Sequence, residues 1–388
     1  MRVLHVGKFF PPYAGGVERS SADLCRALAA RDVGVAMLAH ASPGDRTQVF
    51  VRDGVAVTLA ACYGQLLYAP LSPSFPLLLQ RQIDEFRPDL LHLHMPNVSA
   101  FWALLLPAAR RVPWVVQWHS DVPLDVRRAG VRMMYGAYRP WEQAMLRRAR
   151  AVIATSQPYL ESSTALARWR DKTAVIPLGL DASAGGDRAD ANSSSPNAPA
   201  SLWPQTSAPT LRILGVGRLS YYKGFDVLLR ALAQVPHASL LLIGSGECEA
   251  QLKALARELA IESRVHFAGH VDDGTLARAY GQAQLFCLPS IERTEAFGMV
   301  LLEAMRASLP VIASAIPGSG VGYVVADDKT GLLVPPGDAD ALARALARMA
   351  DDAELRARLG ANGNERWREQ FTLDRCAEQT LQLYRSLL

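Results

Sequence analysis

Short apolar runs and longer amphipathic stretches alternate along the first half of the sequence. The stretch that starts at Val17 (VERSSADLCRALAAR) places Leu24 and Leu28 on one face of a helix. Runs typical of buried strands occupy residues 3–10, 34–39, 90–95, 114–118 and 151–156. Strands that alternate with helices predict a parallel sheet with helices on both faces.

The same alternation returns in the second half. Helical stretches begin at Phe225, Cys248 and Asp273 and again just after Phe297. Strand-like runs occupy residues 211–217, 239–244, 265–269, 285–290, 310–314 and 331–336. The chain therefore predicts two doubly wound halves. Ligands of such sheets bind beyond the carboxyl ends of the strands, so two such domains facing each other would bind a substrate in the cleft between them.

Residues 182–209 interrupt this pattern, because they are rich in Ala, Ser, Pro, Gly and Asn and offer little to bury. We interpret them as a linker or a mobile insertion. The predicted domains are then residues 1–181 and residues 210–371, followed by a helical tail.

Composition narrows the classes of protein. The 388 residues are 50% hydrophobic and 20% charged, with a formal charge of +4 that does not indicate a nucleic-acid partner. Five scattered cysteines without a CxxC pair favour reduced thiols in a cytoplasm-like compartment. No stretch of eighteen apolar residues is present, so we expect a soluble protein or one that lies on a membrane without crossing it.

Two cations lie in a short loop after the strand at 211–217. Arg218 and Lys223 are followed by Gly224 and a helix start. A guanidinium that grips two oxygens, an ammonium and free helix-start amides would form a pocket for a diphosphate. The alternative is that both cations are ordinary solvated surface residues.

Two loops of the first half also end strands. Gly15 and Gly16 stand before a helix start, where free N–H groups favour an anion, although a plain turn explains them equally. His119 follows the strand at 114–118 and could donate a hydrogen bond to a sugar or assist a leaving group, or it could be a structural histidine. His92 and His94 share one strand face; without a third ligand at metal spacing, structural packing is the better interpretation.

The stretch TEAFGMVLLEAM (294–305) holds two glutamates around an apolar run. We place Glu295 in the loop and Glu303 about one and a half turns inside a helix that begins near Gly298. The two carboxylates would then lie on the order of 10 Å apart, which suits a ligand with hydroxyls at both ends and a charged middle, such as a nucleotide sugar. The N–H groups of Gly298, Met299 and Val300 would be unsatisfied helix-start donors and form the last part of the predicted site. The alternative makes Glu295 a dipole-favoured acid and Glu303 a surface residue.

Together these residues resemble glycosyltransferase family 4, retaining enzymes of the GT-B fold. The resemblance covers nearly the whole chain and rests on these segments: PPYAGGVE, WHSD, IPLG, GVGRLSYYKGFDVLLRAL, IGSGE, the Glu–seven residues–Glu stretch and TGLLVPPGD. The segment WHSDVP with the arginines that follow is similar to bacterial mannosyl- or rhamnosyltransferase-like members that build surface polysaccharide or lipopolysaccharide on a lipid carrier.

The resemblance implies a role for each site residue. Arg218 and Lys223 would hold the donor diphosphate, and Glu303 would bind the ribose. Glu295 would contact sugar hydroxyls, near the amides of Gly298, Met299 and Val300. Gly16, beside Gly15, would lie close to the donor phosphate and His119 beside the transferred sugar. Residues 1–181 would face the acceptor, residues 210–371 would bind the donor, and the final helix (372–388) would pack back on the first domain.

The resemblance also implies chemistry without an essential metal or a dedicated base. Cations and helix amides would neutralise the leaving diphosphate, and the leaving phosphate would take the proton of the acceptor while the configuration is retained. The only co-substrate would be a nucleotide diphosphate sugar. We expect Lys223→Ala to weaken donor binding and Glu295→Ala to lower turnover with the fold intact.

A basic segment gives local support for membrane contact. Residues 126–150 hold seven arginines and one glutamate, interleaved with Met, Tyr and Trp. Such a segment can lie on an anionic membrane, here the cytoplasmic face of the inner membrane. A phosphate-tracking surface for nucleic acid and an amphipathic helix packed on the sheet are the alternatives.

Three functions fit the sequence. The first is hexose transfer, of mannose or a related sugar, from a nucleotide diphosphate sugar to a saccharide acceptor, which we expect to be lipid-linked. The second is an isomerase on the same fold, such as a nucleotide-sugar 2-epimerase. The third is a protein that binds sugar nucleotides without catalysis.

Overall fold

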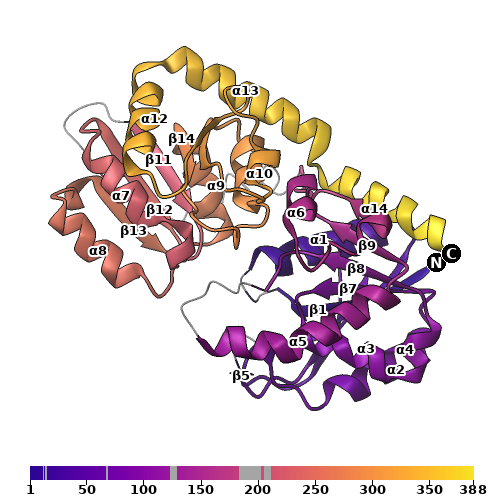
Figure 1. Ribbon diagram of the computed structural model, residues 1–388. Coiled ribbons are helices and arrows are strands. Elements are labelled where there is room, and N and C mark those ends of the chain that lie inside the picture. Colours follow the sequence, from indigo (N-terminus) through magenta and orange to yellow (C-terminus); the bar gives the residue numbers. More distant parts are fainter. Residues whose placement is uncertain (12, 14, 67–68, 123–128, 183–201, 205–210) are drawn as a thin grey trace. The chain divides into compact units, whose positions relative to one another are not determined.

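The computed structural model describes residues 1–11, 13, 15–66, 69–122, 129–182, 202–204 and 211–388 (Figure 1). The chain divides into two compact units. Unit 1 consists of Met1–Gly179 and Leu373–Leu388, and unit 2 consists of Leu180–Thr372. Most of the stretch interpreted as a linker lies outside the described residues.

Unit 1 contains an eight-stranded sheet within the described residues, in the order β10-β9-β8-β7-β1-β2-β4-β3. The strands are β1 (Arg2–Phe9), β2 (Gly34–His40), β3 (Gln48–Arg52), β4 (Val55–Ala60), β7 (Leu90–Met95), β8 (Trp114–Trp118), β9 (Ala151–Ala154) and β10 (Thr173–Val175). The central strands are buried along their whole length, as expected for a parallel sheet covered on both faces. A separate antiparallel pair joins β5 (Gln65–Leu66) and β6 (Ala69–Pro70).

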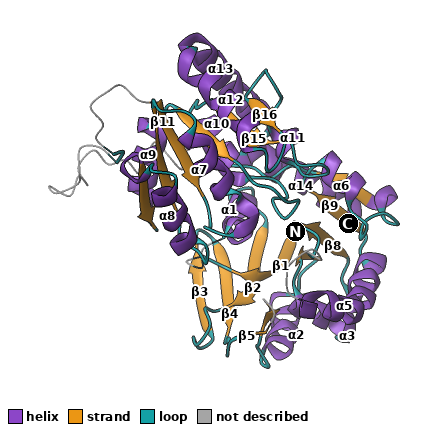
Figure 2. Ribbon diagram, turned by 60° about the vertical axis from the view of Figure 1, so that its left-hand side comes forward, coloured by secondary structure: helices purple, strands orange, loops and turns teal. Residues whose placement is uncertain are grey.

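The edge of this sheet differs from the predicted all-parallel arrangement. Strand β3 pairs antiparallel with β4 and lies at the outer end of the sheet (Figure 2). Asp53 and Gly54 connect the two strands, and both have positive φ, 51° and 79°. A two-residue turn of this kind matches the right-handed twist of a hairpin, and Asp-Gly is its typical sequence. The Asp-Gly dipeptide in the sequence indicates this hairpin, but the prediction from alternating strands and helices did not take it into account.

Helices cover both faces of the sheet of unit 1. One face packs against α1 (Gly16–Ala29) and α14 (Leu373–Leu387), which lie side by side (Figure 1). Helix α2 (Phe75–Phe86) contacts β1 and β2, and the ring of Phe75 stacks on His40. The other helical segments of unit 1 are η1 (Val98–Phe101), α3 (Trp102–Leu105), α4 (Pro107–Arg111), α5 (Ala129–Arg148), α6 (Gln157–Ser162) and η2 (Arg170–Lys172).

Unit 2 contains a six-stranded sheet that is parallel throughout, in the order β13-β12-β11-β14-β15-β16. Its strands are β11 (Leu211–Val216), β12 (Ala238–Ile243), β13 (Val265–Gly269), β14 (Leu285–Leu288), β15 (Val311–Ser314) and β16 (Leu332–Val334). Each of them overlaps a run that the sequence predicted as a strand, and only β12 begins outside its run, by one residue. The two predicted parallel-sheet halves are therefore confirmed.

Both faces of this second sheet are also covered. On one face Leu285 and Cys287 of β14 join a core with α7 (Phe225–Ala233), α8 (Glu249–Glu258) and α12 (Ala339–Asp351). Phe286 points to the opposite face and stacks on Tyr280 of α9 (Asp273–Gln282). The remaining helical segments are η3 (Tyr221–Lys223), η4 (Glu262–Arg264), α10 (Met299–Arg306), α11 (Val321–Val324) and α13 (Ala353–Gln370).

The packing of residues 202–204 shows that the stretch 182–209 is not a linker along its whole length. Trp203 is only 4% exposed, and its Nε1 donates a hydrogen bond to the carbonyl of Ile213 in β11 at 3.2 Å. A large aromatic side chain can be buried when its polar N–H finds such a partner. This part of the stretch therefore belongs to the packing of unit 2.

None of the helices in the described part of the chain combines the length and the apolar character needed to cross a membrane.

Candidate active site

The loop after β11 brings a lysine into contact with the loop after β14. Segment η3 ends at Lys223, and Gly224 follows with a left-handed φ of 64°. A Cβ atom at Gly224 would lie 2.2 Å from the carbonyl oxygen of Pro289, so only glycine fits this close approach. The glycine that the sequence placed before the helix thus allows the two loops to touch.

Lys223 and Glu295 form a buried ion pair at this contact. Lys223 Nζ lies 2.5 Å from Glu295 Oε2, and both side chains are 10% exposed. The hydroxyl of Ser290 donates to the same carboxylate oxygen at 2.9 Å. Ser319 Oγ donates to the backbone carbonyl of Glu295, which fixes this residue from a third loop.

The ion pair determines the charge state of the lysine. Burial by itself lowers the pKa of Lys223, but the Glu295 carboxylate outweighs that effect, and the pKa of Lys223 is raised above its ordinary value. The ammonium group is therefore charged near neutral pH, as a diphosphate site requires.

Arg218, the second predicted cation, is an exposed residue of the same loop. It follows β11 directly, five positions before Lys223 in the sequence. Unit 2 therefore offers one buried and one exposed positive charge after a single strand. A pair of this kind can bind two oxygens from different sides.

Helix α10 begins where the sequence placed it. Gly298 is the N-cap, with φ of 84°, and no side chain caps the helix. Residues with a side chain rarely adopt such a φ, so the turn into the helix favours glycine. Met299 and Val300 form the first turn, whose N–H groups have no partner inside the helix. They are suited to an anion.

Glu303 lies in the second turn of α10 and has a separate partner. The hydroxyl of Tyr280 in α9 donates to Glu303 Oε2 at 2.8 Å. Glu303 is half-buried, which differs from the alternative of a plain surface residue. Tyr280 was not among the sequence candidates, because nothing in the pattern of α9 distinguishes it from a packing residue.

The glycine pair of unit 1 stands at the start of α1. Gly15 is the N-cap and Gly16 the first helical residue; both are exposed, and no side chain caps the helix. A Cβ at Gly15 would lie 2.0 Å from Glu18 Oε2, so the Glu18 carboxylate already lies against this backbone. The two glycines are thus exposed but have a carboxylate beside them, and their binding of an anion stays a prediction.

His119 lies directly after β8, but its orientation differs from the expected one. It is 5% exposed, and its Nε2 lies 3.0 Å from Nδ1 of His94. Its Nδ1 is buried without a hydrogen-bond partner among the described residues. The alternation of β8 places His119 on the same face as Val115 and Gln117, which is the face that packs under α1. Burial lowers the pKa of His119 to about 4, so the ring is neutral near pH 7.

His92 and His94 have a third histidine beside them, which sequence spacing did not reveal. His5 of β1 is the register partner of His92, and ligand nitrogens of His5, His92 and His94 lie within 4.8 Å of one another. The three rings are stacked, with centroids 4.5 to 5.3 Å apart and interplanar angles of 9 to 28°. A metal ion must lie near the plane of every imidazole that binds it, and stacked planes do not converge on one point. The geometry favours packing, as the sequence interpretation did.

Each half of the chain matches a known protein family. Residues 206–366 match the family model described as Glycosyl transferases group 1, and residues 15–179 match the Glycosyl transferase 4-like domain. The chain is 29% identical to the O-antigen chain mannosyltransferase C of Escherichia coli over 393 residues, covering 100% of this chain and 99% of the relative.

Two further similarities extend over nearly the full length. The chain is 30% identical to the D-rhamnosyltransferase WbpZ of Pseudomonas aeruginosa, covering 96% of this chain and 92% of that protein. Among solved structures it is similar to the sucrose-phosphate synthase of Thermosynechococcus elongatus, with a TM-score of 0.79 and 28% identity over 100% and 99% of the two chains. These similarities confirm the predicted GT-B architecture.

The buried ion pair of unit 2 generates a stability prediction. Lys223→Met leaves the Glu295 carboxylate buried without its cation, and we expect unit 2 to lose about 3–5 kcal/mol. Adding Glu295→Gln removes that charge, so the double variant should be more stable than the Lys223→Met variant. Denaturant unfolding followed by hydrogen exchange of unit 2 peptides measures both.

The matched control for this cycle is Lys253→Met, in an exposed pair with Glu249 at 2.7 Å. We expect this substitution to cost at most about 1 kcal/mol. Losses that simply add in the Lys223/Glu295 double variant would show that the two side chains do not depend on each other. The ion pair also means that Glu295→Ala, expected from sequence to leave the fold intact, should carry a stability cost.

The histidines generate a pH prediction. The five histidines of unit 1 are buried, whereas the three of unit 2, at positions 237, 266 and 270, are exposed. Burial lowers the pKa of His40 and of His119 to about 4. Below pH 6.5 the unfolded chain therefore takes up protons that the folded unit does not. The stability of unit 1 is full above pH 6.5 and falls as the pH drops toward 4, by on the order of 3 kcal/mol for each of these two histidines.

Hydrogen exchange of the intact chain at pH 7.5 and pH 5, corrected for intrinsic rates, measures this effect. We expect peptides of unit 1 to lose protection at pH 5 while peptides of unit 2 retain theirs. A His237→Gln variant, altered at an exposed histidine, should show the same pattern. Equal loss of protection in both units would contradict the prediction.

Proposed function

Because the chain belongs to the group 1 glycosyltransferases, and is thus an enzyme that moves a sugar from a nucleotide-sugar donor to an acceptor, we propose that it transfers a hexose, mannose or a related sugar. The names of two relatives that match over nearly their full length, a mannosyltransferase and a D-rhamnosyltransferase, support this choice of sugar. The acceptor that we propose is a lipid-linked saccharide of surface polysaccharide or lipopolysaccharide synthesis.

The observation that carries the donor site is the Lys223–Glu295 pair in unit 2. It combines a cation kept charged by its partner with a carboxylate that has only one of its oxygens bonded to Lys223 and Ser290. In our proposal, Lys223 and the exposed Arg218 hold the donor diphosphate. Glu295 accepts hydrogen bonds from the hydroxyls of the sugar and orients it.

The start and the second turn of α10 complete this proposal. The uncapped amides of Gly298, Met299 and Val300 would receive the negative charge of the sugar phosphate. Glu303 would accept from the ribose hydroxyls, with its carboxylate held in place by Tyr280. One loop and one helix thereby provide groups for each part of a nucleotide sugar.

Unit 1 supplies two further groups in this proposal. Gly15 and Gly16 at the start of α1 would approach the donor phosphate with their backbone amides, once the Glu18 carboxylate that lies against Gly15 moves aside. His119 would lie beside the transferred sugar as a neutral ring that can offer one N–H.

We further propose that the transfer retains the anomeric configuration. The bond between the anomeric carbon and the diphosphate oxygen breaks, and the acceptor oxygen bonds to the same face of that carbon. The acceptor proton passes to the leaving phosphate oxygen, so no carboxylate base is required. Charge that develops on the diphosphate is met by Arg218, Lys223 and helix amides, and no metal is needed for that purpose.

Exposed apolar side chains support a membrane-facing role for unit 1. Of fifteen exposed large hydrophobic residues in the described chain, fourteen belong to unit 1. Helix α5 carries Met133, Met134 and Trp141 among them, together with exposed Arg139 and Arg147. Side chains that combine apolar surface with positive charge suit the surface of an anionic membrane, where a lipid-linked acceptor would be found.

Arg218→Ala tests the donor site without disturbing the buried pair. Loss of a charged hydrogen bond is worth about 1.5–3 kcal/mol, so we expect kcat/KM for the donor to fall by about tenfold or more. Because Arg218 is exposed, the stability should change by at most about 0.5 kcal/mol. Nucleoside diphosphate release from UDP-, GDP- and dTDP-sugars, with and without crude lipid-linked acceptor and with a chelator, measures the reaction.

The matched control is Arg212→Ala, an exposed arginine within β11, which should leave kcat/KM unchanged within about twofold. Release that depends on acceptor, survives the chelator and yields the donor's anomeric configuration supports the proposal. Equal activity of the Arg218→Ala and wild-type enzymes would show that Arg218 does not bind the donor. Inversion of the anomeric configuration would overturn the proposed mechanism.

A second experiment tests membrane contact. We expect co-sedimentation with vesicles that contain phosphatidylglycerol, and little with phosphatidylcholine alone or at high salt. Replacing Met133 and Trp141 by serine removes buried apolar area at the membrane and should weaken binding by about tenfold or more. The control pair, Val49→Ser and Val51→Ser, removes two exposed apolar side chains from β3. Equal binding of both double variants would rule out α5 as the contact.

A further inference from the structure

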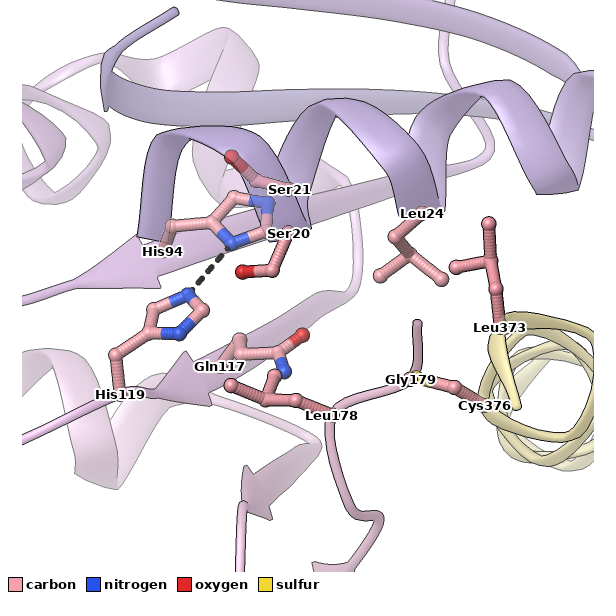
Figure 3. Close-up of a pocket in the computed structure, with 10 residues that line it drawn as sticks. All are labelled: Ser20, Ser21, Leu24, His94, Gln117, His119, Leu178, Gly179, Leu373 and Cys376. Atoms are coloured by element: carbon pink, nitrogen blue, oxygen red, sulfur yellow. Dashed lines mark hydrogen bonds between the residues drawn. The ribbon is translucent and has the colours of Figure 1, made fainter. Parts of the chain in front are cut away.

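A row of three histidines connects the middle of the sheet of unit 1 with the end of β8. His5 Nδ1 lies 3.0 Å from His94 Nε2, and His94 Nδ1 lies 3.0 Å from His119 Nε2. The second of these contacts is drawn in Figure 3. The exposed fractions of the three residues are 0%, 3% and 5%. We refer to His5, His94 and His119 as the histidine row.

Strand alternation explains why the rings meet. His5 shares a strand face with Val3, His94 with Leu90, and both apolar residues belong to the core under α1 and α14. His119 continues the same face beyond β8. Polar rings thus replace aliphatic side chains on three neighbouring parallel strands, in the middle of β1, near the end of β7 and directly after β8.

Neutral imidazoles in such a row cannot choose their tautomers independently. Each neutral ring has one N–H and one lone pair, and each contact needs one of each. The proton therefore lies on Nδ1 in all three rings or on Nε2 in all three. The rings are neutral because burial lowers the pKa of His5, His94 and His119 below that of an ordinary histidine.

The two ends of the row decide between these states. His5 Nε2 is buried without a partner among the described residues. His119 Nδ1, at the other end, is also buried without such a partner, but His119 lines a small cavity that can hold a water or a hydroxyl group. A proton on Nε2 of every ring would leave an N–H donor at the His5 end, and orphaned buried donors are rarer than orphaned acceptors. The Nδ1–H state leaves only a lone pair at His5 and places the N–H on His119, beside the cavity where it can find an acceptor.

We propose that His94 and His5 are positioning residues that hold His119 as its Nδ1–H tautomer, so that the ring presents a hydrogen-bond donor to the small cavity beneath the start of α1. This inference rests on the proposed function, in which His119 lies beside the transferred sugar. The positioning itself is a property of the protein alone and can be measured without a reaction.

The cavity gives that donor a place to act. His119, Gln117 and Ser20 line a space of about 10 Å³ together with residues of α14 (Figure 3), close to the volume that one water or one hydroxyl oxygen requires. Gln117 Oε1 is buried without a partner among the described residues. A hydroxyl group in this space could accept from His119 Nδ1–H and donate to Gln117 Oε1.

His92 provides a control within the same stack. Its ring stacks on both His5 and His94, with centroids 4.6 and 4.5 Å away, yet its Nδ1 hydrogen-bonds to the hydroxyl of Tyr384 in α14. His92→Phe and His94→Phe thus each replace one buried ring of the stack. Only the second substitution interrupts the histidine row.

Long-range proton–nitrogen NMR correlation of the intact protein, labelled with nitrogen-15 at histidine, tests the tautomers. We expect the wild-type spectrum to show Nδ1–H for His5, His94 and His119. In His94→Phe the His119 signal should become that of a mixed or Nε2–H ring, and in His92→Phe it should not change. A wild-type His119 with its proton on Nε2, or a His119 signal indifferent to His94→Phe, would overturn the proposal. The wild-type spectrum alone can do so if a variant fails to fold.

Kinetics then connect the tautomer to transfer. We expect His94→Phe to lower kcat by about tenfold, which corresponds to about 1.4 kcal/mol, while His92→Phe changes kcat by less than about threefold at a similar stability loss. Equal loss of kcat in the two variants would show that His94 has only a structural role. If wild-type protein shows the expected tautomers but transfers no sugar, the proposed function fails and the positioning stands.

Discussion

Lys223 and Glu295 lie 72 residues apart in sequence, and their contact joins the loop after β11 to the loop after β14 in unit 2. Removing either partner leaves a charge inside a site where water cannot replace it. The contact depends on Gly224, whose missing side chain lets the loop after β11 meet the loop after β14. Ser290 and Ser319 then fix the carboxylate and its backbone from two further positions. In the donor site that we propose, both charges of this pair would interact with a ligand that carries hydroxyls and phosphates.

The polar side chains buried in unit 1 also need hydrogen-bond partners, but these side chains are neutral. Histidines fill positions where the parallel strands would otherwise present aliphatic side chains, and they bond to one another instead of pairing with carboxylates. Because each ring has one donor and one acceptor, a row of rings transmits its orientation from one member to the next. The charged site of unit 2 and the uncharged row of unit 1 are therefore two different solutions to the burial of polar groups at strand ends.

Sequence periodicity predicted most of the fold, because runs such as LLHLHM and WVVQW coincide with β7 and β8 in full. The positions of Glu295 outside and Glu303 inside α10 also followed from the glycine that precedes the helix. The Lys223–Glu295 ion pair could not be predicted, because nothing in the sequence tells whether a lysine and a glutamate 72 residues apart will touch. His5 was missed because it lies on another strand, and only the register of β1 and β7 brings it to His92. Trp203 was missed because its neighbours have the composition of a linker.

Unit 1 is built from two separate stretches of chain, and this arrangement constrains the order of its synthesis and folding. The core under α1 includes Leu381 and Tyr384, which emerge from the ribosome only after all of unit 2. Unit 2 is continuous and can close its own core earlier, whereas the sheet of unit 1 must wait with one face uncovered. Domains usually fold in the order in which they are made. Here the first one begun is the last one finished, so a nascent chain halted before α14 would expose an apolar surface to chaperones and proteases.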